Sequence, residues 1–243
     1  MPTNGLKIGI IGGYVSGKAT FLNALLKTSC FRMRSNTHNH VIVQIQAGEK
    51  NIEWNYMGMD SQDWKKSRVD IRFSKTYQRI GVKIPRFLWG NTVFYDFPQI
   101  NDVTQWKKDY IQEVARMDDL LCVLDAEYLL SEINKKILAT LARHNLSAVI
   151  INKCDRIDEI LGLRTQLQEL YPNDFQKFRV FTISSDLELQ RWTTPEERIK
   201  KFAFTESREQ AMRICDLAFS DLRVWLYELL NYYNCSTPTK KEK

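Results

Sequence analysis

Short apolar runs and stretches of helical spacing alternate along this chain. Five runs are dense enough in apolar residues to predict buried strands of a parallel sheet, at 7–11, 92–95, 120–124, 148–151 and 178–183. Between them, apolar residues recur every three or four positions, which predicts helices over 20–26, 101–117, 131–144 and near 157–170. This order predicts an α/β fold in which helices cover both faces of a mostly parallel central sheet.

A different pattern fills the space between the first two strands of that sheet. Residues 28–39 are polar and show no periodicity, which marks where a mobile switch would lie, and 41–46 alternate as a half-buried strand does. Short β-like pieces at 52–56, 69–73 and 80–84 follow, separated by polar turns. They predict an antiparallel extension of the sheet.

The C-terminal region predicts a long amphipathic helix. Its apolar positions follow steps of four and three, and this stripe is a docking face. This face packs on the body of the same domain, or it serves contact with a partner or a coiled coil. We expect a main domain over 1–190, a helical segment packed on it over 191–235 and a disordered tail over 236–243. The stripe consists of Cys215, Phe219, Leu222, Leu226, Leu229 and Tyr233.

Composition limits the partners and the cellular compartment that we expect for this chain. Its 243 residues carry a net charge of +6, but 35 Lys and Arg are interspersed with 29 Asp and Glu, so a solvated surface explains the charge and no nucleic-acid partner is expected. The five cysteines lack C-x-x-C spacing, which favours free thiols in a reducing cytosol. No apolar run is long enough to cross a bilayer, so we expect a cytoplasmic protein whose membrane contact, if any, is peripheral.

The first predicted strand runs into a glycine loop that opens a helix. Gly12 to Lys18 fits the frame G-x-x-x-x-G-K, in which backbone N–H groups wrap a polyphosphate and the lysine reaches the terminal phosphates. Ala19 stands where Ser or Thr normally supplies a hydroxyl to Mg²⁺, so we expect the metal to be held weakly. Thr20 is rotated by about 100° from that position and offers its backbone N–H to the α-phosphate instead. The expected nucleotide-binding residues of this loop are Gly12, Gly13, Tyr14, Val15, Ser16, Gly17, Lys18, Ala19 and Thr20.

A guanine-recognition motif follows the strand at 148–151. Asn152-Lys153-Cys154-Asp155 reads N-K-x-D, in which the Asp155 carboxylate accepts both the ring N–H and the exocyclic amine of guanine. Asn152 would tie this turn to the phosphate loop, and the Lys153 stem would cover the base while its ammonium stays wet. The alternative is a capping turn with Asp155 at the N-cap of a helix. Ser184 and Ser185 end the next strand, where a backbone amide could meet the guanine carbonyl, or they form an ordinary turn before a helix.

Two further segments are candidates for metal binding and catalysis. Asp96 ends the strand at 92–95 and can hold Mg²⁺ through a water, while Gln99 takes the place of a glycine whose N–H would contact the terminal phosphate. Thr37 is the best candidate for a switch threonine that contacts the metal, the alternative being a plain loop threonine. We therefore assign catalytic roles to Lys18, Thr37 and Gln99 and metal roles to Asp96 and Thr37. The nearby His38 and His40 are better explained as solvated loop residues.

Together these motifs resemble the dynamin-like GTPases of the translation-factor-related class, particularly bacterial members. The resemblance rests on Gly12 to Leu25, on Asp96-x-Pro98 and on the N-K-x-D box, and the long separation of Lys18 from Asp96 suits that plan. It implies a P-loop GTPase fold that binds GTP, GDP and Mg²⁺, forms a homodimer across its nucleotide face and acts with a membrane or a stalk-type partner. Three positions depart from the family pattern: Val15, Ala19 and Gln99.

Two functions are open at this point. The first is a G domain that binds GTP and GDP and hydrolyses GTP slowly, because the guanine box is intact. The second is a pseudo-GTPase that serves as a nucleotide-bound or empty scaffold, because all three departures touch the hydrolytic machinery. A phosphate-loop kinase or ATPase conflicts with the motif at 152–155.

Overall fold

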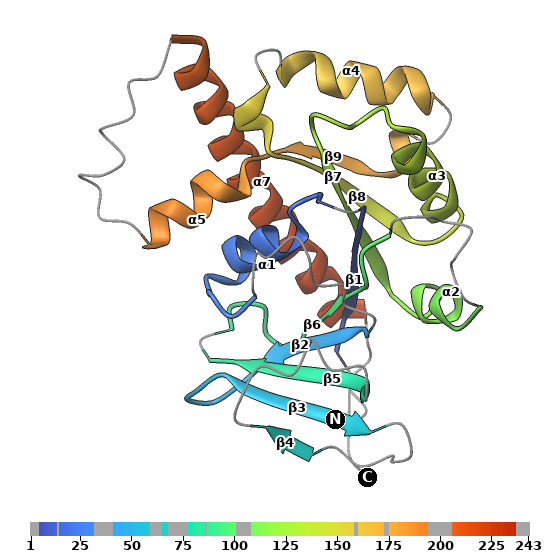
Figure 1. Ribbon diagram of the computed structural model, residues 1–243, viewed down its shortest axis with the longest axis vertical. Coiled ribbons are helices and arrows are strands. Elements are labelled where there is room, and N and C mark those ends of the chain that lie inside the picture. The colour runs from blue at the N-terminus through green and yellow to red at the C-terminus, as the bar shows by residue number, and fades with distance from the viewer. Residues whose placement is uncertain are drawn as a thin grey trace.

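The computed structural model describes residues 5–13, 15–31, 41–58, 65–67, 77–85, 87–100, 108–157, 160–172, 175–193 and 206–236. Strands and helices alternate through most of this range (Figure 1). The strands are β1 (Lys7–Gly12), β2 (Val43–Ala47), β3 (Glu53–Gly58), β4 (Lys65–Ser67), β5 (Tyr77–Ile84), β6 (Val93–Asp96), β7 (Asp119–Asp125), β8 (Leu146–Asn152) and β9 (Arg179–Thr182). The helices are α1 (Lys18–Leu26), α2 (Lys108–Val114), α3 (Glu132–Leu141), α4 (Ile160–Leu170), α5 (Ser185–Thr193) and α7 (Glu206–Ser236), with 3₁₀ turns η2 (Cys154–Arg156) and η3 (Phe175–Lys177).

The strands of the described residues form one sheet, in the order β4-β3-β5-β2-β6-β1-β7-β8-β9. All neighbours from β6 to β9 are parallel, whereas β2 is antiparallel to β6, and β3 is antiparallel to both β5 and β4. A mostly parallel sheet with an antiparallel extension was predicted and is confirmed. The extension contains one exception, because β2 and β5 pair in parallel. β5 lies between β2 and β3 and runs antiparallel to β3, so β2 and β3 run in opposite directions on either side of it.

Local differences from the predicted elements have identifiable causes. The short edge strand β4 was missed because its Lys-Lys-Ser sequence carries no apolar alternation, although lysine is common on sheet edges. The alternation at 41–46 predicted a half-buried strand, but Gln44 of β2 is buried, and β2 lies inside the sheet between β5 and β6. The strand expected at 69–73 and the first part of the helix expected at 101–117 lie outside the described residues.

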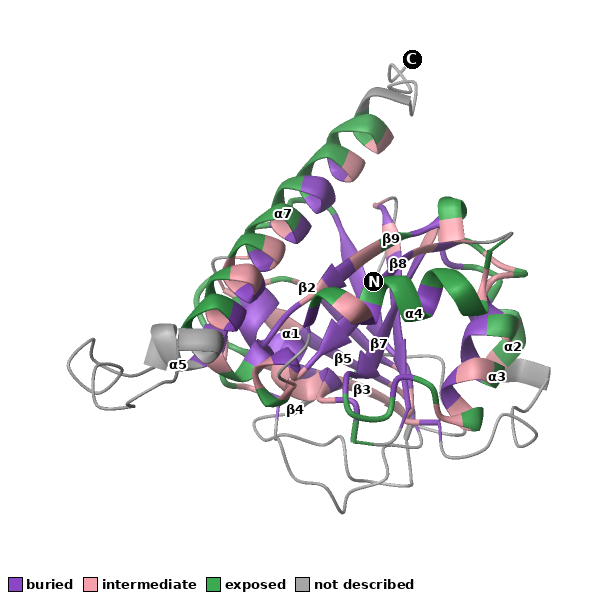
Figure 2. Cartoon of the chain, turned by 90° about the horizontal axis from the view of Figure 1, so that it is seen from above, coloured by how far each residue is buried: buried purple, intermediate pink, exposed green. Residues whose placement is uncertain are grey.

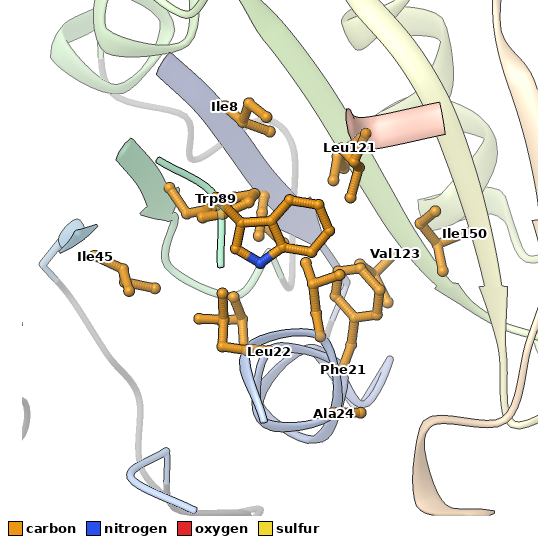
Figure 3. Packing of buried hydrophobic residues seen from close by; sticks show 14 of the residues in the cluster. Ile8, Phe21, Leu22, Ala24, Ile45, Trp89, Leu121, Val123 and Ile150 are labelled. Carbon is orange, nitrogen blue, oxygen red and sulfur yellow. The ribbon is translucent and has the colours of Figure 1, made fainter. Parts of the chain in front are cut away.

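Helices cover both faces of the sheet, as predicted. Figure 1 shows α1 and α7 on one side and α2 and α3 on the other. On the first side, Phe21 and Leu22 of α1 pack with strand residues around the indole of Trp89, as Figure 3 shows. A second apolar cluster fills the other side, where buried residues of α3 and α4 meet β7 and β8. The central strands β1, β6, β7 and β8 are thus almost entirely buried, and their carboxyl ends remain for polar residues.

The stripe of α7 packs on the rest of this chain. Figure 2 shows its buried side turned toward the sheet and an exposed side turned away. Phe219 lies 6.4 Å from the ring of Phe21, between ring centroids, and the Arg223 guanidinium lies 4.6 Å from the Phe219 centroid. Arg223 also pairs with Glu188 of α5 at 2.8 Å. These contacts join α1, α5 and α7 into one layer.

The division of the chain into a main domain and a C-terminal segment stays a prediction. The boundary expected at residue 190 falls within α5, and residues 237–243 lie outside the described range. None of the helices in the described ranges combines the length and the apolar character needed to span a bilayer.

Replacing Phe219 with alanine should destabilise the fold by about 3–5 kcal/mol, because its ring is fully buried against α1. Leu217 lies on the outer side of the same helix with 67% of its surface exposed. The matched Leu217→Ala change should therefore alter stability by no more than about 0.5 kcal/mol. Urea unfolding followed by circular dichroism measures both changes. Equal effects of the two substitutions would contradict the packing of α7 on the sheet.

Candidate nucleotide-binding site

The motifs predicted from the sequence meet at the carboxyl ends of the central strands. The loop after β1, the Asp96 segment after β6 and the turn after β8 all lie at this edge. Because β1 is flanked by β6 on one side and β7 on the other, the loop sits where the strand order reverses, which is the usual ligand position in open α/β sheets.

The phosphate loop is shaped by residues in the left-handed region. Gly17 has φ +79°, and a Cβ there would lie 2.5 Å from the Asn152 Nδ2 atom, so only glycine fits. A Cβ on Gly12 would lie 2.5 Å from the Val123 carbonyl oxygen. Val15 has φ +63°, which is unfavourable for a β-branched residue. Tyr14 lies outside the described residues.

Lys18 and Asp96 are paired with each other. The Lys18 Nζ atom lies 2.5 Å from Asp96 Oδ1 and also donates to the Phe97 carbonyl, and both charged side chains are buried. The sequence predicted separate roles for them, on the phosphates and on the metal. The pairing places cation and carboxylate side by side, and one of the three N–H groups of the ammonium stays available to a further acceptor.

The segment after Asp96 lies against the phosphate loop. The Phe97 N–H donates to the Ile10 carbonyl at 3.1 Å, and the Ile100 N–H donates to the Gly12 carbonyl at 3.2 Å. Gln99, between these two bonds, is half-buried, and it is not among the residues with positive φ. Gln99 therefore fits this backbone without left-handed strain, although its side chain still occupies the place of a glycine hydrogen.

Asn152 joins the turn after β8 to the phosphate loop, as expected from the motif. Its Nδ2 donates to the Ser16 carbonyl at 3.0 Å, and its Oδ1 accepts the Ser185 N–H at 3.0 Å. Asn152 is buried, so both bonds are shielded from water. This amide therefore bridges the phosphate loop and the start of α5.

Lys153 differs from its prediction. Its ammonium was expected to stay wet, but Nζ lies 2.5 Å from both the Val15 carbonyl oxygen and Asp125 Oδ2. The Lys153 backbone is left-handed, with φ +64°. Asp125, the last residue of β7, was missed by the sequence analysis. The signal was present, because Asp125 ends a predicted parallel strand as Asp96 does.

Asp155 lies within the 3₁₀ turn η2 and does not cap a helix, so the capping alternative is wrong. Its Oδ1 accepts the Ser184 hydroxyl at 2.6 Å, and Ser184 Oγ in turn accepts the Leu187 N–H at 3.3 Å in the first turn of α5. The turn is also bonded to the segment after β9, because the Cys154 N–H donates to the Ile183 carbonyl at 3.1 Å. A carboxylate has about four acceptor sites, so Asp155 can accept further bonds.

Two buried groups near the site stay neutral. A hydrogen bond with the Cys215 thiol of α7, together with burial, raises the pKa of Cys154 far above its usual value. Burial, and secondarily the nearby Asp96 charge, raises the pKa of Tyr110, whose ring packs 5.2 Å from that of Phe97. The charges of the described site are therefore those of Lys18, Lys153 and the three carboxylates.

Few protein groups at this edge could hold Mg²⁺. Asp96 offers a carboxylate, Ala19 offers no side-chain oxygen, and Thr37, His38 and His40 lie outside the described residues. Within the described ranges, no group of three or more His, Cys, Asp or Glu residues is arranged to hold a metal. This donor set fits a magnesium ion bound mainly by phosphates and waters, which is its usual environment beside nucleotides.

Comparison with known proteins identifies the family. The model of the Dynamin family matches residues 8–154. The chain belongs to the dynamin family. Two solved structures of an oligomerised bacterial dynamin pair, described as sensing and tethering membranes over long range, are similar in fold. They share 14% and 16% identity, with TM-scores of 0.60 and 0.64, and each match covers 94% of this chain.

The dynamin-like fold spans only part of those neighbours. This chain covers 42% of the first structure and 45% of the second. A comparison with curated protein sequences gave no match. The family match and the fold together establish a dynamin-like G domain, and the roles of its individual residues stay predictions.

Val15→Gly should stabilise this dynamin-like domain by about 0.5–1 kcal/mol. The left-handed backbone costs an L-residue about 1–2 kcal/mol, and the greater flexibility of glycine in the unfolded chain offsets part of that gain. Val15→Ala keeps the Cβ and is the matched control, so it should bring little gain. Thermal unfolding of the three proteins decides between strain and side-chain contact, since a gain in both variants would exclude backbone strain as the cause.

Proposed function

We propose that this domain binds GTP and GDP at the carboxyl edge of its sheet and hydrolyses GTP slowly to GDP and phosphate. The observation that carries the proposal is the Asn152 bridge, which holds the N-K-x-D turn against the phosphate loop. A ligand that contacts both the N-K-x-D turn and the phosphate loop needs a group for each, a base for the turn and phosphates for the loop. A nucleotide has that form.

Asp155 would select guanine. Its carboxylate is anchored by Ser184 and keeps acceptor sites for the ring N–H and the exocyclic amine. The Ser185 N–H already bonds to Asn152, so Ser185 would act mainly through that bond. Ser16 and Ser185 are both buried at this edge, next to the two bonds of the Asn152 amide.

The phosphate end would be bound by the loop and by Lys18. The N-terminus of α1, with the N–H groups of residues 17–20, would provide positive potential, and Lys18 can donate its third N–H to the terminal phosphates. Mg²⁺, when bound, would neutralise phosphate charge beside Asp96. Asp96 would meanwhile hold Lys18 in place through the ion pair.

Slow hydrolysis follows from the three departures. Val15 offers no polar side chain to orient a water, Ala19 offers no metal ligand, and Gln99 adds bulk where the terminal phosphate would be contacted. Each affects the transition state more than it affects binding of the guanine base.

The Lys18–Asp96 pair favours a second candidate, a pseudo-GTPase that binds partners without turnover. A buried ion pair satisfies the lysine inside the protein, so a phosphate must compete with a carboxylate for it. Such competition lowers the affinity for triphosphate. Retention of nucleotide without hydrolysis would distinguish this scaffold from the enzyme.

The membrane and partner roles of the domain are also proposals. We infer that it is cytoplasmic and dimerises across its nucleotide face, with peripheral membrane contact or a stalk-type partner. The support is the likeness to the bacterial dynamin pair, which oligomerises and tethers membranes.

Asp155→Ala should weaken GDP binding by about tenfold to a hundredfold, because two hydrogen bonds to a charged acceptor are lost. The unmodified protein should prefer GDP over inosine diphosphate, which lacks the exocyclic amine, and the variant should lose this preference. Titration calorimetry with both nucleotides measures the two effects. An unchanged GDP affinity in the variant would rule out guanine recognition by Asp155.

Ala19→Ser should lower the Mg²⁺ concentration needed for GTP turnover by about tenfold or more, because it adds one oxygen ligand. Phosphate release measured across a magnesium series tests this expectation. Lys18→Ala is the control and should abolish turnover. Turnover at the same rate in the Lys18 variant would show a contaminating enzyme, and no response to serine would place the metal elsewhere.

A further inference from the structure

We propose that Asp125 is a positioning residue of this site, which holds the Lys153 side chain across the phosphate loop and so couples the guanine-recognition turn to the phosphate-binding loop. This inference rests on the proposed function. It adds a residue from a third strand, β7, which belongs to neither motif.

The fold places Asp125 directly beside the guanine-recognition motif. It is the last residue of β7 and lies opposite Asn152 in the parallel register with β8. The Ala126 N–H donates to the Asn152 carbonyl at 2.9 Å, which fixes the two strand ends together. Asp125 is 4% exposed, so its charge needs partners inside the protein.

Both oxygens of the Asp125 carboxylate are used. Oδ1 accepts the Glu127 N–H at 3.0 Å, which orients the carboxylate, and Oδ2 accepts from Lys153 Nζ at 2.5 Å. The two bonds restrict rotation of the Asp125 carboxylate. The Lys153 ammonium therefore pairs with a carboxylate that is held in one orientation.

Lys153 spans the loop because Asp125 holds its far end. Its Nζ also donates to the Val15 carbonyl, and its Cε would lie 3.5 Å from a Cβ on Gly17. The lysine stem therefore runs beside two left-handed residues of the phosphate loop, Val15 and Gly17. A carbonyl held in this way favours the left-handed loop conformation, which a free valine would leave.

Removing the Asp125 carboxylate would free the Lys153 side chain from its position beside the phosphate loop. A lysine side chain has many rotamers, and ordering it for a ligand costs conformational free energy that Asp125 has already offset in the folded chain. Without Asp125 the ammonium keeps only the Val15 carbonyl, so the stem would no longer be fixed below the base. Both the base end and the phosphate end of the ligand should then bind less well.

The other end of the same strand offers a matched control. Asp119, the first residue of β7, accepts a hydrogen bond from the Ser147 hydroxyl of β8 and lies at the opposite edge of the sheet. Asp119→Asn removes the same charge from the same strand without touching the loop. Its effects report what any loss of a carboxylate from β7 does to the domain.

The experiment is a double-mutant cycle with Asp125→Asn and Lys153→Met, with two readouts. The first is GDP affinity by calorimetry. We expect Asp125→Asn to weaken it by about tenfold in the parent protein and by less than about twofold in the Lys153→Met background. Asp119→Asn should change it by less than about twofold in either background.

The second readout needs no nucleotide. Hydrogen exchange of peptides covering residues 12–18 should become faster in Asp125→Asn, but not faster still when Lys153 is already methionine. Equal losses of GDP affinity in both backgrounds, or unchanged exchange, would overturn the role of Asp125. Absence of GDP binding in the parent would instead refute the proposed function, and hydrogen exchange alone would then decide whether Asp125 and Lys153 hold the loop.

Discussion

The buried Asn152 side chain is the interaction on which the candidate site depends. Its amide donates to the phosphate loop and accepts from the start of α5, so three segments that are distant in sequence share one side chain. A buried amide with unsatisfied groups would be costly, and both of its polar atoms are paired here. The fold can therefore keep the loop and the turn at one fixed separation, which a ligand with two ends requires.

Three of the five described residues with positive φ lie around that bridge. Val15, Gly17 and Lys153 all have positive φ, and Lys153 contacts the loop that contains the other two. Conformations of this kind persist only where surrounding contacts determine them, and they gather at functional sites. The contacts here are the Asn152 amide and the ion pair of Lys153 with Asp125, so the left-handed loop is held by two residues of the N-K-x-D turn and by the last residue of β7.

The two ends of the proposed site differ in how far they keep the dynamin-like pattern. On the guanine side, Asn152, Lys153 and Asp155 are present and each has a defined partner. On the phosphate side, Ala19 and Val15 lack the polar groups expected there, and Lys18 is paired within the protein. The departures from the family pattern are thus confined to the phosphate side of the proposed site.

The sequence by itself determined the alternation of the central strands and helices, the two binding motifs and the apolar stripe of α7, because these depend on local spacing of apolar residues, glycines and charges. It did not determine that β5 would lie in parallel beside β2, that Gln44 would be buried, or that Asp125 would pair with Lys153. These features depend on which strands become neighbours, and no local pattern encodes that choice. Only the tertiary structure brings the ends of β7 and β8 together, so only it could show that the lysine expected in water is held by a buried carboxylate.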